Sequence, residues 1–513
     1  MAQGLFPFKY ESSKNNTGMT AMAGLPTFFE LAFVLGMTAS IEKHIKIRGR
    51  QGWRDVEMIM SLVLLNLAGG DHVEDLDRME ADEGMCEVMR KIRTHRMSRK
   101  RRREMQVRWR KGKERAFASR AAAHRYLKGF HDEDQERERE AAREAGIRAF
   151  IPAPNEHLRG FLQVNSDFLA EVQRHRPVKT ATLDQDATLI FCNKQEAKHS
   201  YKGPKAYQPF NTWWAEQQLM VHTEQRDGNV PAGHEQLRCL KESLACLPEG
   251  VEEVLLRSDT AAYQHDILRY CAKGENDRFK VIKFAICCDV TKEFKKAVSE
   301  VKKGEWHRLY RRDKDGTVWE TNQEWAEVCF VPNESAKKKD SPTYRYLAIR
   351  ETLSDPELPG LEKNNPELPF PTIDLDKNRY KLFGIVTNMD WEGERLIWWQ
   401  RERCGKSEEV HDILKSDLAG GIMPSGYFGS NAAWWWIAVL SFNLHMAMKQ
   451  LVLENAWVPK RMKAIRFHII NLPGRVVHHA GYLIVKLCSR GNSFDLLTQI
   501  RQGIAALLPA PAT

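Results

Sequence analysis

The segment Arg403–Gly421, RCGKSEEVHDILKSDLAGG, combines a helical pattern of apolar residues with an acid and a base on one face. Glu408 and Lys415 are seven residues apart, so they lie two turns along the same face of a helix. An acid and a base placed in this way usually form a solvated ion pair. The pattern predicts a helix from about Ser407 to Gly420-Gly421, because its apolar residues recur at spacings of three and four: Val410, Ile413, Leu414 and Leu418.

Two upstream segments each carry an acid at the end of an apolar run. Thr180–Phe191, TATLDQDATLIF, is rich in residues that favour strands, and Asp184 and Asp186 would point to the same side of that strand. Val251–Asp259, VEEVLLRSD, predicts a short strand that ends on its acid. Either acid taken alone could equally serve as a helix cap.

The three acidic sites can converge on one point, since two follow strands and one lies on a later helix. Carboxylates that converge do not ionise comfortably without a cation, and hard divalent metal ions are their natural partners. Two such ions about 4 Å apart stabilise the attacking and leaving oxygens of a phosphodiester. The pattern therefore points to metal-dependent chemistry on a phosphodiester.

On these residues the chain resembles a cut-and-paste DDE transposase of bacterial insertion sequences. The group it resembles has its last acid in a Tyr-x2-Arg-x3-Glu-x6-Lys signature. Asp186-Ala187-Thr188 matches the first acid and Arg257-Ser258-Asp259 the second. Arg403 matches the signature Arg, and Glu408-x6-Lys415 has the family spacing.

Two departures leave the roles of Arg403 and of the missing Tyr open. Four residues, not three, separate Arg403 from Glu408, and the Tyr position falls on Gln400. Five further blocks resemble the same group in order along the chain: Gly24-Leu25-Pro26, Asn66–Asp71, Tyr201-Lys202-Gly203, Arg226–Val230 and Asn431–Trp436. The resemblance therefore covers most of the chain.

The resemblance implies an α/β fold with a ribonuclease H-like catalytic core, interrupted by a β-rich insertion and flanked by helical N-terminal and C-terminal parts. It implies that Asp186, Asp259 and Glu408 are catalytic and hold two Mg²⁺ ions, for which Mn²⁺ could substitute. Asp184 is the alternative to Asp186. Arg403 and Lys415 would hold phosphates. The implied activity is cleavage at the ends of an insertion sequence and strand transfer into target DNA; an inactive DNA-binding relic and a nuclease without strand transfer are the alternatives.

The composition agrees with a polyanionic partner. The net charge is +10 and the pI is about 9.0. Ten cysteines without a CxxC pair favour reduced thiols in a cytoplasm. The resemblance implies a bacterial, nucleoid-associated protein. Ala432–Leu444 is apolar but too short for a bilayer, which predicts a buried helix and no membrane partner.

A strongly basic run extends from Arg90 to Arg120, with fifteen Lys or Arg residues against two Glu. Such a run is either a solvated tail or a surface that contacts the DNA backbone. An acidic segment, His131–Glu144, follows it. The continuous part of the run, which we expect to bind phosphates, is Arg99, Lys100, Arg101, Arg102 and Arg103.

The pattern of elements predicts six regions. A helical domain (1–92), including a helix over Asp71–Ile92, precedes a charged linker (93–175). The resemblance implies that this helical domain recognises DNA, and a plain helical bundle is the alternative. The resemblance implies a catalytic core in two parts (176–288 and 379–450) around a β-rich insertion (289–378), for which an ordinary α+β extension is the alternative. Trp213–Thr223 is expected as further strand. The last region (451–513) is predicted to be helical, broken at Pro473-Gly474-Arg475. Both ends of a mobile segment must be cut together, so we expect a homodimer on double-stranded DNA, with the C-terminal region as the contact: Leu483, Ile484, Leu487, Leu496 and Leu497.

Overall fold

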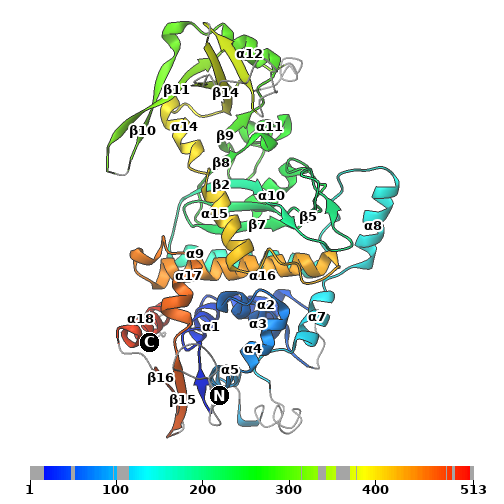
Figure 1. Ribbon diagram of the computed structural model, residues 1–513, viewed down its shortest axis with the longest axis vertical. Helices are drawn as coiled ribbons and strands as arrows, with labels where there is room; N and C mark the ends of the chain where they lie inside the picture. The colour runs from blue at the N-terminus through cyan, green and yellow to red at the C-terminus, as the bar shows by residue number, and fades with distance from the viewer. Residues whose placement is uncertain are drawn as a thin grey trace, which may run out of the picture.

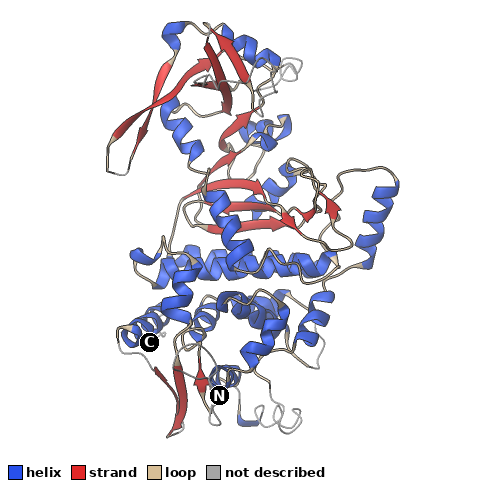
Figure 2. Ribbon diagram, in the orientation of Figure 1, coloured by secondary structure: helices blue, strands red, loops and turns tan. Residues whose placement is uncertain are grey.

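A ten-stranded mixed sheet forms the middle and one end of an elongated molecule, and helices with a small three-stranded sheet form the other end (Figures 1 and 2). The computed structural model describes residues 17–47, 52–95, 98–100, 115–313, 315–332, 342–353, 370–376, 378–480, 482–487 and 491–508. The α/β architecture matches the class that the sequence predicts.

The strands of the large sheet follow the order β10-β11-β12-β14-β9-β8-β2-β6-β7, with β13 paired to β14. Strands β2, β8 and β9 are parallel to one another, and the other neighbours are antiparallel. The bounds are β2 Thr180–Ala187, β6 Phe210–Trp214, β7 Leu219–Glu224, β8 Glu253–Ser258, β9 Lys283–Cys288, β10 His307–Arg312, β11 Val318–Val328, β12 Arg345–Thr352, β13 Thr372–Leu375 and β14 Asn378–Thr387.

The strand structure predicted over Trp213–Thr223 is confirmed at both ends of the segment, but the chain turns back at Ala215–Gln218 and forms the hairpin β6–β7. Gln218 adopts a left-handed φ of 52°, which the sequence does not signal with Gly or Asn. A second, three-stranded sheet in the order β3-β5-β4 lies beside the end of β2. Its strands are β3 Ile190–Phe191, β4 Lys198–His199 and β5 Lys205–Tyr207.

The helix α16 (Phe428–Ala447) runs under the sheet and is buried along its whole length (Figure 1). Its indole groups are packed in the core, and Trp434 and Trp435 are both 0 % exposed. It confirms the buried helix predicted from Ala432–Leu444. Among the described residues no single helix is long and apolar enough to cross a membrane; Asp55–Ala68 and Val73–Glu80 pass that test only together, bent by 96°.

The helices before residue 130 pack on the far side of α16 from the sheet, whereas Glu133–Glu144 lies beside the sheet and Glu156–His175 contacts β7 (Figure 1). The predicted helix over Asp71–Ile92 is wrong, since it breaks after Glu80, where Asp82 caps a new helix by accepting from Met85 N at 2.8 Å. The bounds are α1 Pro26–Val34, α2 Met37–His44, α3 Asp55–Ala68, η1 Val73–Asp75, α4 Leu76–Glu80, α5 Glu83–Arg93, α7 Arg120–Lys128, α8 Glu133–Glu144 and α9 Glu156–His175.

The C-terminal region is only partly helical, so the prediction is wrong over 474–487. There the chain forms the hairpin β15–β16, and β15 also pairs with the N-terminal strand β1 (Met19–Thr20). Leu483, Ile484 and Leu487 therefore lie on a strand. The elements are η5 Met448–Val452, η6 Asn455–Trp457, α17 Met462–Ile465, η7 Arg466–Ile470, β15 Gly474–His479, β16 Tyr482–Leu487 and α18 Ser493–Ala506.

The remaining helices connect the strands of the large sheet or precede α16. They are α10 Gln236–Cys246, η2 Thr260–Ala262, α11 His265–Lys273, α12 Lys292–Ser299, η3 Lys303–Glu305, α14 Gly393–Arg401, α15 Lys406–Asp412 and the π-helical turn η4 Ile413–Asp417. The helix predicted from Ser407 is thus α-helical at first and widens into a π turn. Its apolar face is buried as expected: Val410, Ile413, Leu414 and Leu418.

Candidate functional site

The sheet brings Asp186 and Asp259 to the same edge. Strands β2 and β8 are parallel neighbours in a register that pairs Gln185 with Ser258, so the next residue on each strand is an aspartate. Asp259 Oδ1 accepts a hydrogen bond from Ala261 N at 3.0 Å and so begins η2. The two acids that the sequence placed at strand ends therefore leave adjacent strands side by side.

Asp184 lies on the same strand as Asp186 but has a different environment. Its side chain is fully buried and is held by Arg257, whose Nε and Nη2 atoms lie 2.7 and 2.9 Å from the two carboxylate oxygens. Arg257 also donates to the carbonyl of Trp399 at 2.8 Å and to Glu402 Oε2 at 3.0 Å. Asp184 thus braces β2 against β8 and α14.

Asp186 has an unfavourable electrostatic environment for an ionised carboxylate. Burial raises the pKa of Asp186 to about 6, and the negative charges of Asp259 and Glu408 act in the same direction. Arg403 and the Ala187 amide oppose the rise. The three acids of the predicted set therefore lie close enough to interact through their charges. Asp186 is the acid whose ionised form is destabilised.

Arg403 faces Asp186 from the loop after α14. Its Nη2 atom lies 3.8 Å from Asp186 Oδ2 and donates to the carbonyl of Gln185 at 3.4 Å. Arg403 is only 8 % exposed, and its Nε has no hydrogen-bond partner among the described residues. The guanidinium is thus already engaged with an acid of the site, whereas the sequence predicts a phosphate ligand.

Gln400, at the predicted Tyr position, is buried between two strand ends. Its amide nitrogen donates to the carbonyl of Ser258 at 3.4 Å and lies 3.2 Å from Cys287 Sγ. A glutamine amide can make both contacts at once, so it packs α14 against β8 and β9.

Glu408 and Lys415 do not pair with each other. Glu408 is exposed, and its Oε2 atom accepts from Gly405 N at 2.6 Å, which caps the start of α15. Lys415 instead donates to Thr188 Oγ1 at 2.9 Å, so it binds the Thr of the Asp186-Ala187-Thr188 motif. This contact connects two motifs that lie 227 residues apart.

His411 is a site residue that sequence reasoning missed. It is buried beside Lys415 and Arg403, and its Nε2 atom lies 3.1 Å from Asn211 Nδ2 on β6. Burial, aided by the charges of Lys415 and Arg403, lowers the pKa of His411 to about 3. The neutral ring can accept from Asn211, and nothing in the local sequence separates His411 from an ordinary helix histidine.

The donor types in this site suit a hard divalent cation, because carboxylate oxygens are its preferred ligands. The excess negative charge at Asp186 is what such a cation would relieve. The third acid does not complete a ligand set here, since Glu408 is turned to Gly405. Within the described part of the chain, no three His, Cys, Asp or Glu side chains form a group that could hold a metal ion.

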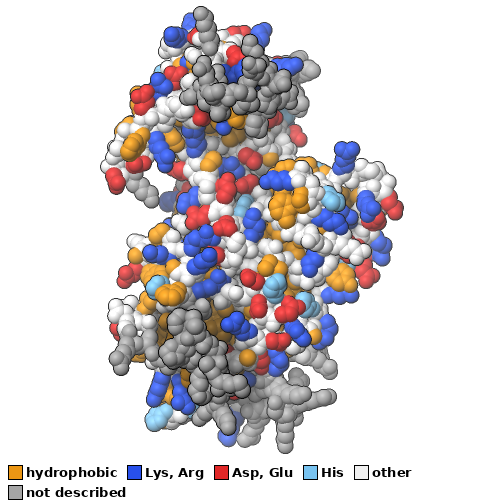
Figure 3. All heavy atoms as spheres, in the orientation of Figure 1, with side chains coloured by type: hydrophobic (Ala, Val, Ile, Leu, Met, Phe, Trp, Pro, Cys, Tyr) orange, Lys and Arg blue, Asp and Glu red, His pale blue; other side chains and the backbone are white. Residues whose placement is uncertain are grey.

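The basic run is described only in part. Arg99 and Lys100 are exposed, while Arg101, Arg102 and Arg103 lie outside the described residues. On the face in Figure 3, Lys and Arg side chains are interspersed with Asp and Glu and do not form one continuous tract.

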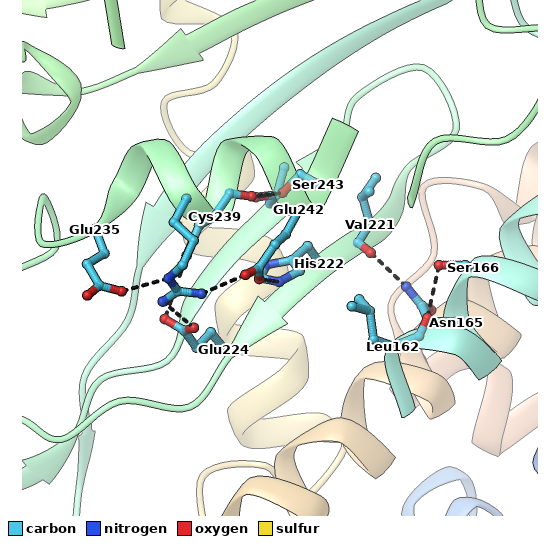
Figure 4. Close-up of polar contacts among 12 residues, drawn as sticks. Leu162, Asn165, Ser166, Val221, His222, Glu224, Glu235, Cys239, Glu242 and Ser243 are labelled. Atoms are coloured by element: carbon cyan, nitrogen blue, oxygen red, sulfur yellow. Dashed lines mark hydrogen bonds and ion pairs between the residues drawn. The ribbon is translucent and has the colours of Figure 1, made fainter. Parts of the chain in front are cut away.

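A second polar cluster connects α10 to β7 (Figure 4). Glu242 accepts from His222 Nε2 and from Arg238 Nη1, both at 2.9 Å, and Arg238 also reaches Glu224 at 2.6 Å. Burial raises the pKa of Glu242, but these hydrogen bonds outweigh it and bring the value to about 2. Because its charges are paired, we assign this cluster a structural role. The cluster borders a cavity of about 50 Å³, and Asp186, Asp259 and Glu408 are not among the residues that line this cavity.

Three comparisons relate the chain to known proteins. The structure is similar to the piggyBac transposase in its synaptic complex with hairpin DNA, with 10 % sequence identity, a TM-score of 0.42 and coverage of 96 % of this chain and 88 % of that one. No curated protein matches the sequence. The model of the family described as transposase DDE domain group 1 matches residues 11–509. Because that match takes in nearly the whole sequence, the chain belongs to the transposase DDE domain family.

Proposed function

We propose that this protein is a DNA transposase that cleaves the ends of an insertion sequence and transfers the cut strands into target DNA. The observation that carries the proposal is the placement of Asp186 and Asp259 on adjacent parallel strand ends, where Asp186 also feels the charge of Glu408. In a chain of the transposase DDE domain family, these are the three acids we assign as catalytic.

We propose that strands β7-β6-β2-β8-β9 are a ribonuclease H-like core. Three parallel strands (β2, β8 and β9) flanked by the antiparallel pair β6–β7 support this. Strands β10 to β13 would then be an insertion, joined to the core through the β9–β14 pairing. The bacterial origin and the assignment to the Tyr-Arg-Glu-Lys group belong to the same proposal.

DDE transposases generally use divalent metal ions, and in this chain Asp186, Asp259 and Glu408 would hold two Mg²⁺, or Mn²⁺ in their place. The ions, when bound, would stabilise the negative charge that develops on the attacking and leaving oxygens of the phosphodiester. Glu408 would have to exchange its hydrogen bond with Gly405 for this role. The free-energy cost of that exchange is small, because the Glu408 carboxylate is exposed and water can take its place at the Gly405 amide.

The neighbouring residues would position the acids and the phosphate. Arg403 offsets part of the charge at Asp186 and so keeps it ionised in a buried place. Thr188 holds the ammonium group of Lys415 beside the strand end that carries Asp186, where it can contact a phosphate oxygen. Nicking exposes a 3′-hydroxyl, and this group is the nucleophile in the transfer step.

The partners in this proposal are the two element ends and the target, all double-stranded DNA. Two chains would assemble on the DNA, since one site handles one end. In a bacterial cell such a protein would act at the nucleoid.

The test is a reaction of the full chain with a labelled linear duplex, Mg²⁺ and a circular target plasmid. Label in the plasmid would support the transposase, cleavage without transfer would indicate a nuclease, and a gel shift alone would indicate a DNA-binding relic. Asp186→Asn is the matched control, because it retains size and polarity but removes the charge.

A further inference from the structure

The turn between β4 and β5 projects a Tyr and a Lys from the small sheet that begins four residues after Asp186. Tyr201 is 77 % exposed, and Lys202 Nζ lies 5.8 Å from the centre of its ring. The segment 191–205, FCNKQEAKHSYKGPK, contains four Lys and one Glu. The turn therefore offers an aromatic face within a basic surface.

The turn is held in one shape. Ser200 N donates to the Pro204 carbonyl and Gly203 N to the Ser200 carbonyl, both at 2.9 Å, and His199 Nδ1 lies 2.7 Å from the Gly203 carbonyl. Gly203 has a φ of +99°, which a side chain would disfavour. Tyr201 is thus presented by a rigid support, and ordering it for a ligand costs little entropy.

The turn is electrostatically coupled to the site. Burial lowers the pKa of Lys415, and the charge of Lys202 acts in the same direction while that of Asp412 opposes it, so the two ammonium groups lie close enough to repel each other. Lys415 is itself bound to Thr188, two residues after Asp186. Two cations near one another, with an exposed ring beside them, form a place where a phosphate relieves the repulsion and a base can stack.

We propose that the β4–β5 turn holds an unpaired stretch of DNA next to the bond that is cut, with a base stacked on Tyr201 and a phosphate between Lys202 and Lys415. The inference rests on the proposed function, because it places this turn beside DNA in the site. A paired duplex presents phosphates but not base faces, so Lys202 would contact either form and Tyr201 only the unpaired one.

The experiment measures binding without cleavage. The full chain is titrated in EDTA against two fluorescent probes, a blunt random 30-bp duplex and the same duplex with a five-nucleotide 3′ thymidine overhang. Tyr201→Ala should weaken binding of the overhang probe about 5- to 100-fold and leave the blunt probe within twofold, because stacking contributes only to unpaired bases. Tyr201→Phe should bind both probes as the wild type does.

Two further variants sharpen the test. Lys202→Ala should weaken binding of both probes and lower the salt slope by about 0.7 to 0.9. Tyr482→Ala is the matched control, because Tyr482 is 74 % exposed on β16 of the C-terminal hairpin. Equal loss of both probes in Tyr201→Ala, or no loss of either, would overturn the proposal. Binding in EDTA is independent of catalysis, so a chain that passes this test but fails to cut in Mg²⁺ would refute the proposed function alone.

Discussion

Asp186→Asn should stabilise the metal-free protein, although it removes a residue that we assign to catalysis. The pKa of Asp186 rises from 3.8 to about 6, which at 1.36 kcal/mol per pH unit corresponds to at most about 3 kcal/mol of unfavourable free energy when the carboxylate is ionised. The side chain is only 23 % exposed, so solvent screens little of this cost. A neutral amide at the same place avoids it.

The sign of the pH dependence follows from the raised pKa. The native state binds the Asp186 proton more tightly than the unfolded state, so the stability of the wild type should fall as pH rises from about 4 to about 6 and stay low above that. Asp186→Asn should lack this fall. The two proteins should therefore be equally stable near pH 4 and differ most at pH 8.

The assay is thermal unfolding in EDTA from pH 4 to pH 8, with Asp184→Asn as the control two residues away on the same strand. That variant leaves Arg257 without its bidentate partner and should lose about 3–5 kcal/mol. At pH 8 we expect Asp186→Asn to raise the free energy of unfolding and Asp184→Asn to lower it. If Asp186→Asn destabilises the protein at pH 8 as Asp184→Asn does, the account of strain at Asp186 is refuted.

Three further outcomes are expected. Replacing Asp259 or Glu408 by Ala should abolish nicking in Mg²⁺ but leave DNA affinity within a few-fold, because the acids serve the metal and not the affinity; full nicking by either variant, assayed on the same samples, would contradict the assignment. Thr188→Val should slow cleavage by about 10- to 100-fold, the loss expected for a hydrogen bond to a charged group, and single-turnover rates equal to the wild type would exclude that role. The last test neutralises four residues of the basic run and follows affinity against salt: Arg99, Arg101, Arg102 and Arg103. Specific and random duplexes should weaken almost equally, with the slope of log affinity against log salt lower by roughly 0.9 per lost phosphate contact; an unchanged slope would identify a solvated tail.

Much of the local structure follows from the sequence alone. The strand before Asp259, the buried helix α16 and the apolar face of the segment after Ser407 are all predicted by periodicity and composition. These elements are predictable because their patterns are long or because a strand-forming run ends on a polar residue. The α/β class follows from their alternation.

Where the sequence-based prediction fails, the deciding feature is either a partner distant in the chain or a backbone conformation that the residue types do not signal. Strand β15 forms beside Met19–Thr20, more than 450 residues away, so a run that reads as a broken helix becomes a hairpin. The β6–β7 turn depends on a left-handed Gln218 that carries no Gly or Asn signal. Propensity is a weak prior in both places, and tertiary contacts override it.

The candidate site shows the same division. The residue types and spacings mark Asp186, Asp259 and Glu408 as acids that could act together. Only the register of β2 against β8 makes Asp186 and Asp259 neighbours, and only the Arg257 pair distinguishes Asp184 from Asp186. The contact between Lys415 and Thr188 likewise exists only in the folded chain. Spacing along a sequence determines which residues share a face of a helix or strand, whereas packing between distant elements determines which faces meet.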